Sequence, residues 1–326
     1  MEQKLETTAT AQVEKQKKDS SRKKFLTKII VALAFAAIVF PLLTAVAYSS
    51  VPGRIIGFII YFLIISLCLY EFGKILPLPN WAKYYIPLLS ALFVFYPFQD
   101  FQNWIISNDT ERFAEYIKSQ YLFTILGVDG LGYLFTALYL VIPFMFIRQF
   151  SWKILAMFAL MFVGTIMIGI TGKILYYLNG GDFWLMLILI AATIMTDSFA
   201  YFGGKFLGNK FFKRKLAPKI SPNKTIEGAI VGYLVGFIIA IVSLNFYEFD
   251  HWDFQESIWN LWWFKMIIFP LTLPIVAIIG DLAFSFVKRV VDVKDFANFM
   301  PEHGGFLDRF DSIIVVTFFY LMIFLV

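Results

Sequence analysis

The sequence predicts an all-α, polytopic integral membrane protein with about nine transmembrane helices and a cytoplasmic N-terminus. The composition, the lengths of the apolar runs and the distribution of basic residues among the loops support this class. Of the 326 residues, 60% are hydrophobic and 16% are charged, and the mean hydropathy is +0.73. A soluble domain is about 45–50% apolar and about 25% charged. The surplus of apolar side chains therefore indicates a domain that faces lipid.

Apolar windows that approach the length of a spanning helix, about 20 residues, define the expected elements. They lie at 28–48, 53–71, 83–98, 128–147, 153–172, 183–203, 226–246, 264–284 and 312–326. The third and the last are short for a span. The tripeptide Ala-Val-Ala at 45–47 resembles a signal-peptidase site, but the apolar run before it exceeds the usual length of about 7–15 residues. We therefore expect the first window to remain as a span.

The chain divides into a polar tail and one membrane domain. Residues 1–27 are polar and basic and cannot bury enough apolar surface to fold alone, so we expect a disordered cytoplasmic tail. Residues 28–326 form a single membrane domain, since no polar stretch is long enough to build a second core. The one cysteine, Cys68, lies in an apolar run and excludes an intrachain disulfide.

Charge in the loops agrees with a cytoplasmic tail. The loop 204–225 then falls inside, and it carries seven Lys or Arg residues and no acidic residue. The loops 99–120 and 247–263 fall outside and together carry eight acidic residues against two basic ones. This is the positive-inside asymmetry. The net charge of +5 is thus explained by topology, and we expect a lipid bilayer rather than nucleic acid as the partner.

Two carboxylates belong to predicted spans and approach the same membrane surface. Asp197 lies in the last third of the span 183–203, and Asp281 lies near the end of the span 264–284. Both spans run inward, so both carboxylates approach the cytoplasmic face. A carboxylate at membrane depth costs about 2.5–3.5 kcal/mol and is rarely tolerated without a partner or a wet cavity. The pair predicts either a polar site at that face or ion pairs that only hold helices together.

The loop that we expect after the eighth span, beginning at Asp281, is the densest cluster of charge. From Lys288 to Asp311 it holds four basic and five acidic residues around His-Gly-Gly at 303–305, and it is net acidic although it faces inward. Carboxylates suit Mg²⁺, and Lys and Arg suit phosphate oxygens. The glycines allow close approach to a ligand or a positive φ. Together they predict a nucleotide-triphosphate site, although the histidine also suits a structural role in a tight turn.

A second polar segment, residues 221–228, opens the span 226–246. Ser221, Asn223 or Thr225 is suited to cap that helix, and free amides in its first turn would favour an anion. Alternatively, Lys224 and Glu227 are three residues apart and could pair on one helix face without any catalytic role.

The segment 285–311 resembles the diagnostic pattern of phosphatidate cytidylyltransferases. In that pattern Ser, Lys-Arg, Lys-Asp, Pro, His-Gly-Gly and Asp-Arg-x-Asp recur at the spacings present here. The segments 197–204 and 221–228 are similar to the family's earlier motif. Two positions differ: Glu302 stands where a glycine is common before the histidine, and Phe284 stands where bacterial members commonly have an acidic residue. Upstream of residue 197 only the hydrophobicity matches.

The resemblance implies an enzyme that transfers a cytidylyl group from CTP to phosphatidate, forming CDP-diacylglycerol and pyrophosphate. Its catalytic part would lie at 190–311, in a polar cavity open to the cytoplasm and the bilayer of a plasma-membrane protein. Matches to catalytic positions are Lys288, Arg289, Lys294, Asp295, His303, Arg309 and Asp311. Matches to nucleotide-binding positions are Asp197, Ser221, Lys224, Thr225, Glu227, Gly304 and Gly305. Asp281 and Asp308 match the aspartates expected to hold Mg²⁺, with a monovalent cation such as K⁺ and a homodimer as further options.

Two other classes remain as alternatives. Another CTP-dependent membrane lipid enzyme, such as a polyprenol or phytol kinase, would share the nucleotide and differ in the acceptor. An ion-coupled transporter would also place carboxylates in the membrane. Transport by inverted repeats predicts matching broken helices in both halves, and no counterpart of the 197–311 region precedes residue 150, which disfavours the transporter.

Overall fold

The computed structural model describes residues 40–45, 51–75, 83–84, 152–181, 183–245, 262–297 and 305–324. Its long helices are α2 (Val51–Lys74), α7 (Trp152–Gly181), α8 (Phe183–Leu207), α9 (Ile226–Asn245), α10 (Trp262–Val290) and α11 (Asp311–Phe324). Strands β1 (Lys215–Ala217) and β2 (Ser221–Thr225) lie between α8 and α9, and a 3₁₀ helix, η4 (Leu307–Arg309), precedes α11.

Five helices in the described part of the chain are long and apolar enough to cross a membrane. They lie in α2, α7, α8, α9 and α10, whereas α11 is a shorter apolar helix. The predicted class of helical membrane protein is therefore confirmed. The windows 28–48, 83–98 and 128–147, the tail and the two outer loops lie wholly or largely outside the described residues. The count of about nine spans and the side of the N-terminus stay predictions.

Helix α10 extends further than the sequence analysis expected, because the residues from Asp281 to Val290 are helical rather than a loop. The helix ends in a Schellman motif. Asp292 has a positive φ of 58°, and the N–H of Val293 donates to the Lys288 carbonyl at 2.9 Å. Lys288 and Arg289, in the last turn, also interact favourably with the negative end of the helix dipole. As a result, Lys288 is held on a rigid helix.

A short β-hairpin, which the sequence analysis did not predict, lies between two helices of an otherwise helical structure. Strands β1 and β2 pair antiparallel, with Lys215 opposite Thr225 and Ala217 opposite Ser221. Thr225 then caps α9, because its Oγ1 accepts a hydrogen bond from the N–H of Gly228 at 3.1 Å. The predicted cap at Thr225 is confirmed, whereas Ser221 lies at the start of β2.

Small residues let α8 and α9 pack closely. Gly228, Gly232 and Gly236 recur every fourth residue along α9. A Cβ on Gly232 would lie 2.5 Å from the carbonyl oxygen of Thr196 and 2.7 Å from the Cβ of Ala200, so a larger side chain would separate the helices. Such small-xxx-small ridges are typical of helix pairs in membranes. The packing holds the hairpin beside the C-terminal end of α8.

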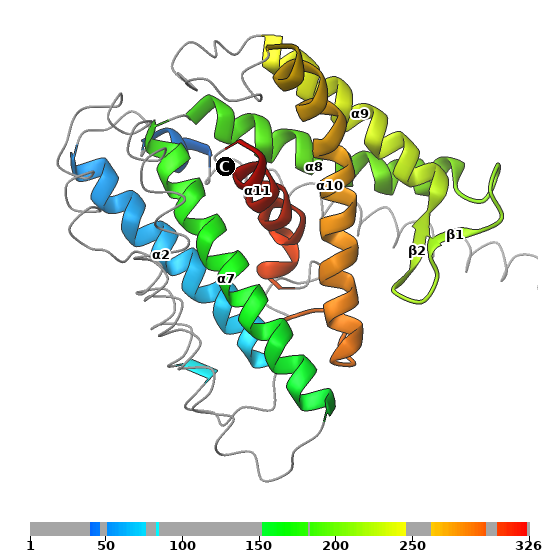
Figure 1. Ribbon diagram of the computed structural model, residues 1–326, viewed down its shortest axis with the longest axis horizontal. Helices are drawn as coiled ribbons and strands as arrows, with labels where there is room; N and C mark the ends of the chain where they lie inside the picture. Colours follow the sequence, from blue (N-terminus) through cyan, green and yellow to red (C-terminus); the bar gives the residue numbers. More distant parts are fainter. Residues whose placement is uncertain are drawn as a thin grey trace, which may run out of the picture.

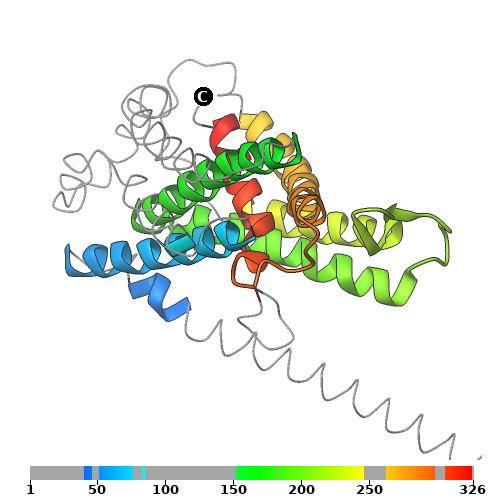
Figure 2. The same ribbon diagram turned by 90° about the horizontal axis from the view of Figure 1, so that it is seen from below.

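Helix α11 lies between the two halves of the described structure (Figures 1 and 2). On one side α2 and α7 lie side by side, on the other side are α9, the hairpin and α10, and α8 runs from the end of α7 past α11 to the hairpin. Ile313, Ile314 and Val316 of α11 are buried, and the hydroxyl of Thr171 on α7 donates to the Ile314 carbonyl at 3.1 Å. Helix α11 packs against α10, and η4, just before it, contacts α2.

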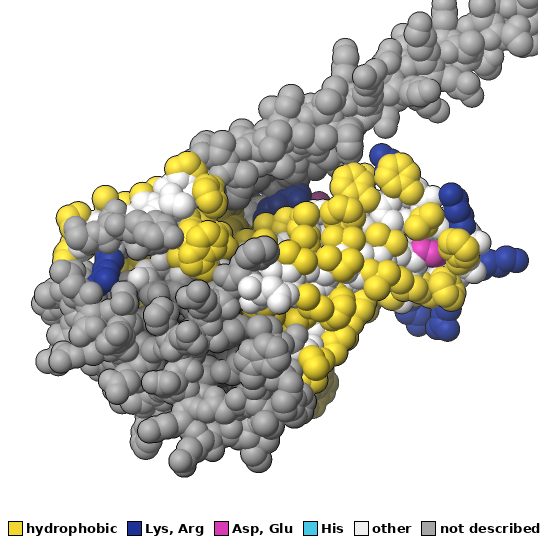
Figure 3. All heavy atoms as spheres, turned by 90° about the horizontal axis from the view of Figure 1, so that it is seen from above, with side chains coloured by type: hydrophobic (Ala, Val, Ile, Leu, Met, Phe, Trp, Pro, Cys, Tyr) yellow, Lys and Arg dark blue, Asp and Glu magenta, His cyan; other side chains and the backbone are white. Residues whose placement is uncertain are grey.

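Figure 3 shows a continuous hydrophobic surface that ends at a rim of Lys and Arg side chains. Large apolar residues are exposed along both α8 and α9, among them Ile194, Phe206, Ile230 and Leu234. An exposed apolar area of this kind is unusual for a water-soluble protein and suits a helix surface that faces lipid.

Candidate active site

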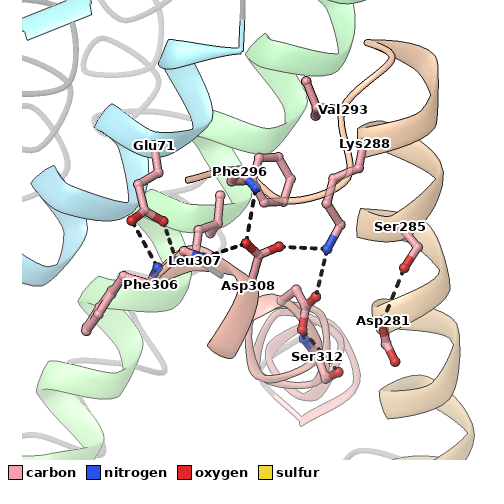
Figure 4. A network of polar contacts seen from close by, with 12 residues as sticks. Glu71, Asp281, Ser285, Lys288, Val293, Phe296, Phe306, Leu307, Asp308 and Ser312 are labelled. Carbon is pink, nitrogen blue, oxygen red and sulfur yellow. Dashed lines mark hydrogen bonds and ion pairs between the residues drawn. The ribbon is translucent and has the colours of Figure 1, made fainter. Parts of the chain in front are cut away.

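Asp308, in η4, lies in a network of hydrogen bonds and ion pairs that is nearly closed to solvent (Figure 4). Its Oδ2 accepts hydrogen bonds from the N–H groups of Phe296 at 3.1 Å and Gly305 at 2.9 Å. Its Oδ1 pairs with Lys288 Nζ at 2.7 Å, and the same Nζ lies 3.7 Å from Asp311 Oδ2. The side chains of Lys288 and Asp308 are only 11% and 8% exposed. The carboxylate of Asp308 is thus enclosed by partners from the protein itself.

Asp281 occupies a more open position on α10. Its Oδ2 forms an ion pair with Lys224 of β2, and the hydroxyl of Ser285 donates to Oδ1 at 3.5 Å. The side chains of Lys224 and Asp281 are 26% and 29% exposed. Asp281, Ser285 and Lys288 share one face of α10, because residues three and four apart are neighbours on a helix. One helix face therefore connects the open aspartate with the closed network.

Asp197 and Asp311 complete the group of acidic residues. Asp197 on α8 is close enough to Asp281 and Lys224 for their charges to interact, and Ser312 hydrogen-bonds to it. Asp311, at the start of α11, interacts with the charges of Asp281, Lys288 and Asp197. Its Oδ1 accepts the N–H of Ser312 at 2.8 Å. The two motif segments of the sequence therefore meet in space around these carboxylates.

Other predicted site residues hold the hairpin and loops instead. Glu227 accepts hydrogen bonds from the N–H groups of Phe211 at 3.1 Å and Phe212 at 2.9 Å. The alternative that Lys224 pairs with Glu227 is wrong, because Lys224 pairs with Asp281. Glu227 thus ties the segment before β1 to the start of α9, and Lys224 links β2 to α10.

The basic and acidic residues around the end of α10 differ in their contacts. Arg289 donates from Nε to the Ile220 carbonyl at 3.1 Å and from Nη1 to the Val293 carbonyl at 3.3 Å. It therefore links α10 to the hairpin. Lys294, Asp295 and Arg309 are exposed. His303 and Gly304 lie outside the described residues.

Comparison with known proteins identifies the family. The model of the cytidylyltransferase family matches residues 26–326. This chain belongs to the cytidylyltransferase family. It is 35% identical over 159 residues to the phosphatidate cytidylyltransferase of Rickettsia bellii, an alignment that covers 48% of this chain and 64% of that protein. The corresponding enzymes of Bacillus subtilis and Staphylococcus haemolyticus are 38% and 43% identical over 148 and 122 residues.

The cytidylyltransferase chain matches only part of these curated relatives. The alignments cover 44% of this chain and 50% of the Bacillus subtilis protein, and 37% of this chain and 42% of the Staphylococcus haemolyticus protein. In all three alignments, including that with the Rickettsia bellii protein, the matched segment spans less than two thirds of the relative's length. The family is thus established across the chain, and the activity of the whole protein is argued below from its site.

The open carboxylates of this cytidylyltransferase fit a hard divalent cation better than Asp308 does. Mg²⁺ usually takes one or two protein carboxylates and leaves its other positions to phosphates and water. Among the described residues, no three acidic, histidine or cysteine side chains are grouped so as to hold a metal by themselves. Asp281 is partly exposed, whereas Asp308 already accepts three hydrogen bonds. The donor set fits an ion that substrate phosphates complete.

The sequence analysis missed two residues that the structure brings to this region. Glu71, on α2, accepts hydrogen bonds from the N–H groups of Phe306 and Leu307. Ser312, at the start of α11, contacts Asp311 and Asp197. Glu71 had a readable signal, since it is a carboxylate within the apolar window 53–71, as Asp197 is within its own window. Ser312 had none, because a serine is tolerated at almost any depth.

Proposed function

We propose that this protein transfers a cytidylyl group from CTP to phosphatidate, releasing pyrophosphate and forming CDP-diacylglycerol. The meeting of Lys224 and Asp281 carries the proposal. Lys224 comes from the motif segment 221–228, and Asp281 lies one helical turn before the segment 285–311, on the same face of α10 as Lys288. Basic and acidic side chains at one half-buried position suit a metal-nucleotide complex. Membership of the cytidylyltransferase family and the names of the relatives support the same reaction.

In the proposed reaction, a phosphate oxygen of phosphatidate attacks the α-phosphorus of CTP. The new P–O bond forms as the bond to the β-phosphate oxygen breaks, and the electron pair leaves with pyrophosphate. A phosphate monoester has a second pKa of about 6, so the nucleophile is largely ionised near neutral pH and needs no strong general base. Catalysis then consists of alignment and neutralisation of charge.

The protein's own groups supply that alignment. Lys224 and Lys288 are the cations nearest the open carboxylates, and each is fixed by an aspartate. We propose that Lys224 leaves Asp281 for a phosphate oxygen when substrate binds, whereas Lys288 stays with Asp308. Mg²⁺, held by Asp281 with Asp197 or Asp311 nearby, would neutralise charge on the phosphates when bound. Asp308 would then orient Lys288 rather than bind the ion directly.

We also propose that the chain is a multi-pass protein of the plasma membrane with this site on the cytoplasmic side. The site lies at the end of α8 and α10 that carries the hairpin, whose segment is the most basic loop of the chain. Cysteine labelling in intact cells tests the orientation. A cysteine introduced at Ser257 should react with an impermeant reagent, and one at Lys213 should react only after lysis. The reverse pattern would invert the topology.

The reaction is tested with purified protein, Mg²⁺, phosphatidate and CTP labelled separately at the α- and the γ-phosphate. Cytidylyl transfer carries the α-label into the lipid and releases the γ-label as pyrophosphate. A CTP-dependent lipid kinase would instead carry the γ-label into a lipid alcohol. An α-labelled lipid that is lost in Asp281→Asn supports the proposal, and γ-labelled lipid alone would replace it with the kinase reaction.

A further inference from the structure

We propose that Glu71 is a positioning residue of the active site, which fixes the turn carrying Asp308 and Arg309 from helix α2. The inference rests on the proposed function, because the turn belongs to the site described above. Glu71 is more than 200 residues before this turn in the sequence. Helix α2 belongs to the part of the chain that matches no catalytic motif, yet the Glu71 carboxylate reaches the turn of the site, beside the contact of Phe72 with Phe296.

Both oxygens of Glu71 are used. Oε1 accepts the N–H of Phe306 at 2.9 Å, and Oε2 accepts the N–H of Leu307 at 2.7 Å (Figure 4). The side chain is only 1% exposed, so both contacts lie away from water. Hydrogen bonds to a charged acceptor are roughly twice as strong as neutral ones, and a fork of two fixes direction as well as distance. Glu71 therefore holds two successive peptide groups at one place.

The contacts of Glu71 form part of a larger arrangement of three successive amides. The N–H of Gly305 donates to Asp308, and the next two donate to Glu71. Successive N–H groups that converge in this way form an anion-binding nest. Here the protein's own carboxylates fill the nest. The amides from Gly305 to Leu307 therefore serve to shape the turn rather than to cradle a phosphate, which revises the role predicted for Gly305.

The nest also explains why residue 305 is a glycine. A Cβ at this position would lie 2.6 Å from Glu71 Oε2, 2.9 Å from the Ala297 nitrogen and 3.1 Å from Asp308 Oδ2. A side chain would therefore displace Glu71 or Asp308. The turn therefore depends both on the Glu71 carboxylate and on the absence of a side chain at Gly305. Substitution of Gly305 is a second way to disturb it.

A shift of this turn would displace Asp308 and Asp311, and with them Lys288. Asp308 orients Lys288, and Asp311 begins α11 immediately after the turn. Misplacement of catalytic groups by about 1 Å can lower a rate by about a hundredfold. A purely structural Glu71 would instead stabilise the fold without affecting turnover in the protein that remains folded. The two roles predict different kinetics.

The test compares Glu71→Gln with Tyr176→Phe. Glutamine keeps the shape but has one acceptor oxygen, and its amide group opposes the second N–H. The Tyr176 hydroxyl of α7 donates to the Arg54 carbonyl of α2 at 2.7 Å. Arg54 lies at the other end of α2, seventeen residues before Glu71 and about 25 Å away along the helix axis, so loss of this buried hydrogen bond is a control for a hydrogen bond made by α2 outside the site. For each protein we would measure thermal stability, hydrogen exchange of the peptide 305–310, and kcat and KM for both substrates.

We expect Glu71→Gln to lower kcat and kcat/KM together by at least about tenfold, with little change in KM, because positioning acts in the transition state. Exchange at 306 and 307 should accelerate by about tenfold or more. Tyr176→Phe should keep normal kcat and normal exchange at the turn. If Glu71→Gln does not fold, Gly305→Ala tests the same turn with Glu71 intact and should show the same kcat loss.

Normal kcat in folded Glu71→Gln, or a loss of stability alone that Tyr176→Phe reproduces, would overturn the proposal. Failure of the proposed function has a different signature. If the wild-type protein forms no CDP-lipid, the reaction is wrong, and the exchange measurement still decides whether Glu71 holds the turn. Unchanged exchange at 306 and 307 in that case would reject the role of Glu71 as well.

Discussion

The surroundings of Asp281 and Asp308 differ in the kind of partner and in exposure. Asp281 faces one lysine from the hairpin and one hydroxyl, and 29% of its side chain is exposed. Asp308 accepts two backbone N–H groups and a buried lysine, and 8% of its side chain is exposed. A lysine on a hairpin can exchange its aspartate for a phosphate without disturbing the fold. Amides in a buried turn cannot do so, and the open aspartate is therefore better placed to bind and the closed one to position.

Asp281→Asn should produce the largest effect on activity. The amide keeps the shape but loses the charge that a magnesium ligand must supply, so turnover should fall by at least about a hundredfold. The melting temperature should change little, because the side chain is partly exposed and an exposed pair contributes little stability. Steady-state assays at increasing Mg²⁺ and a thermal melt in detergent measure both. Near-normal activity at all Mg²⁺ concentrations would remove Asp281 from the metal site.

Asp308→Asn should lower stability as well as activity. Removing one partner of a buried charge pair costs up to about 3–5 kcal/mol, and here Lys288 loses its nearer counter-charge and keeps only Asp311, at 3.7 Å. We expect a clear drop in the melting temperature and at least about a tenfold loss of kcat. The Mg²⁺ dependence should keep the wild-type shape. A raised Mg²⁺ requirement with normal stability would show instead that Asp308 is a metal ligand, and the contrast with Asp281 would disappear.

The sequence predicted the long apolar helices, but it did not predict the hydrogen bonds and the ion pair that enclose Asp308. The apolar windows at 183–203 and 226–246 correspond to α8 and α9 within a few residues, because an apolar run of that length has few alternatives in a bilayer. The charge of Lys288 and Arg289 suggested a loop, whereas both residues lie in the last turn of α10. The helix runs on to the Schellman motif at Asp292, and Lys288 of its last turn pairs with Asp308 and Asp311. Composition reports neither of these contacts.

The candidate site was predictable to a similar degree. The predicted directions of the spans placed Asp197, Asp281 and the basic loop at one membrane surface, and the pairing of Lys224 with Asp281 agrees with that. Spacing says nothing of which backbone amides converge on a carboxylate, since that depends on φ and ψ at residues 296 and 305–307. The structural roles of Glu71 and Glu227, which both hold pairs of successive amides, are of this kind.

Arg309→Lys should have a smaller effect and concerns the same turn as Asp308. Arg309 is exposed beside a buried aspartate. A forked guanidinium makes paired contacts to phosphate that an ammonium does not reproduce. If Arg309 contacts a substrate phosphate, kcat and kcat/KM should fall together by about tenfold, while the melting temperature stays unchanged. Wild-type values for all parameters would leave Arg309 with only a structural role.

Thr225→Ala should have the smallest effect, and it tests how firmly the open region holds Lys224. Thr225 caps α9 directly after Lys224, through a hydrogen bond of 3.1 Å from the N–H of Gly228. Loss of such a cap costs about 1 kcal/mol, which should lower the melting temperature slightly. Thr225→Ser keeps the oxygen and serves as the control. Because Lys224 is free to adjust in its exposed position, kcat should fall by no more than about threefold in the alanine variant. A loss as large as that of Asp281→Asn would mean that the hairpin is held as rigidly as the turn around Asp308, and that Lys224, like Lys288, works only from a fixed position.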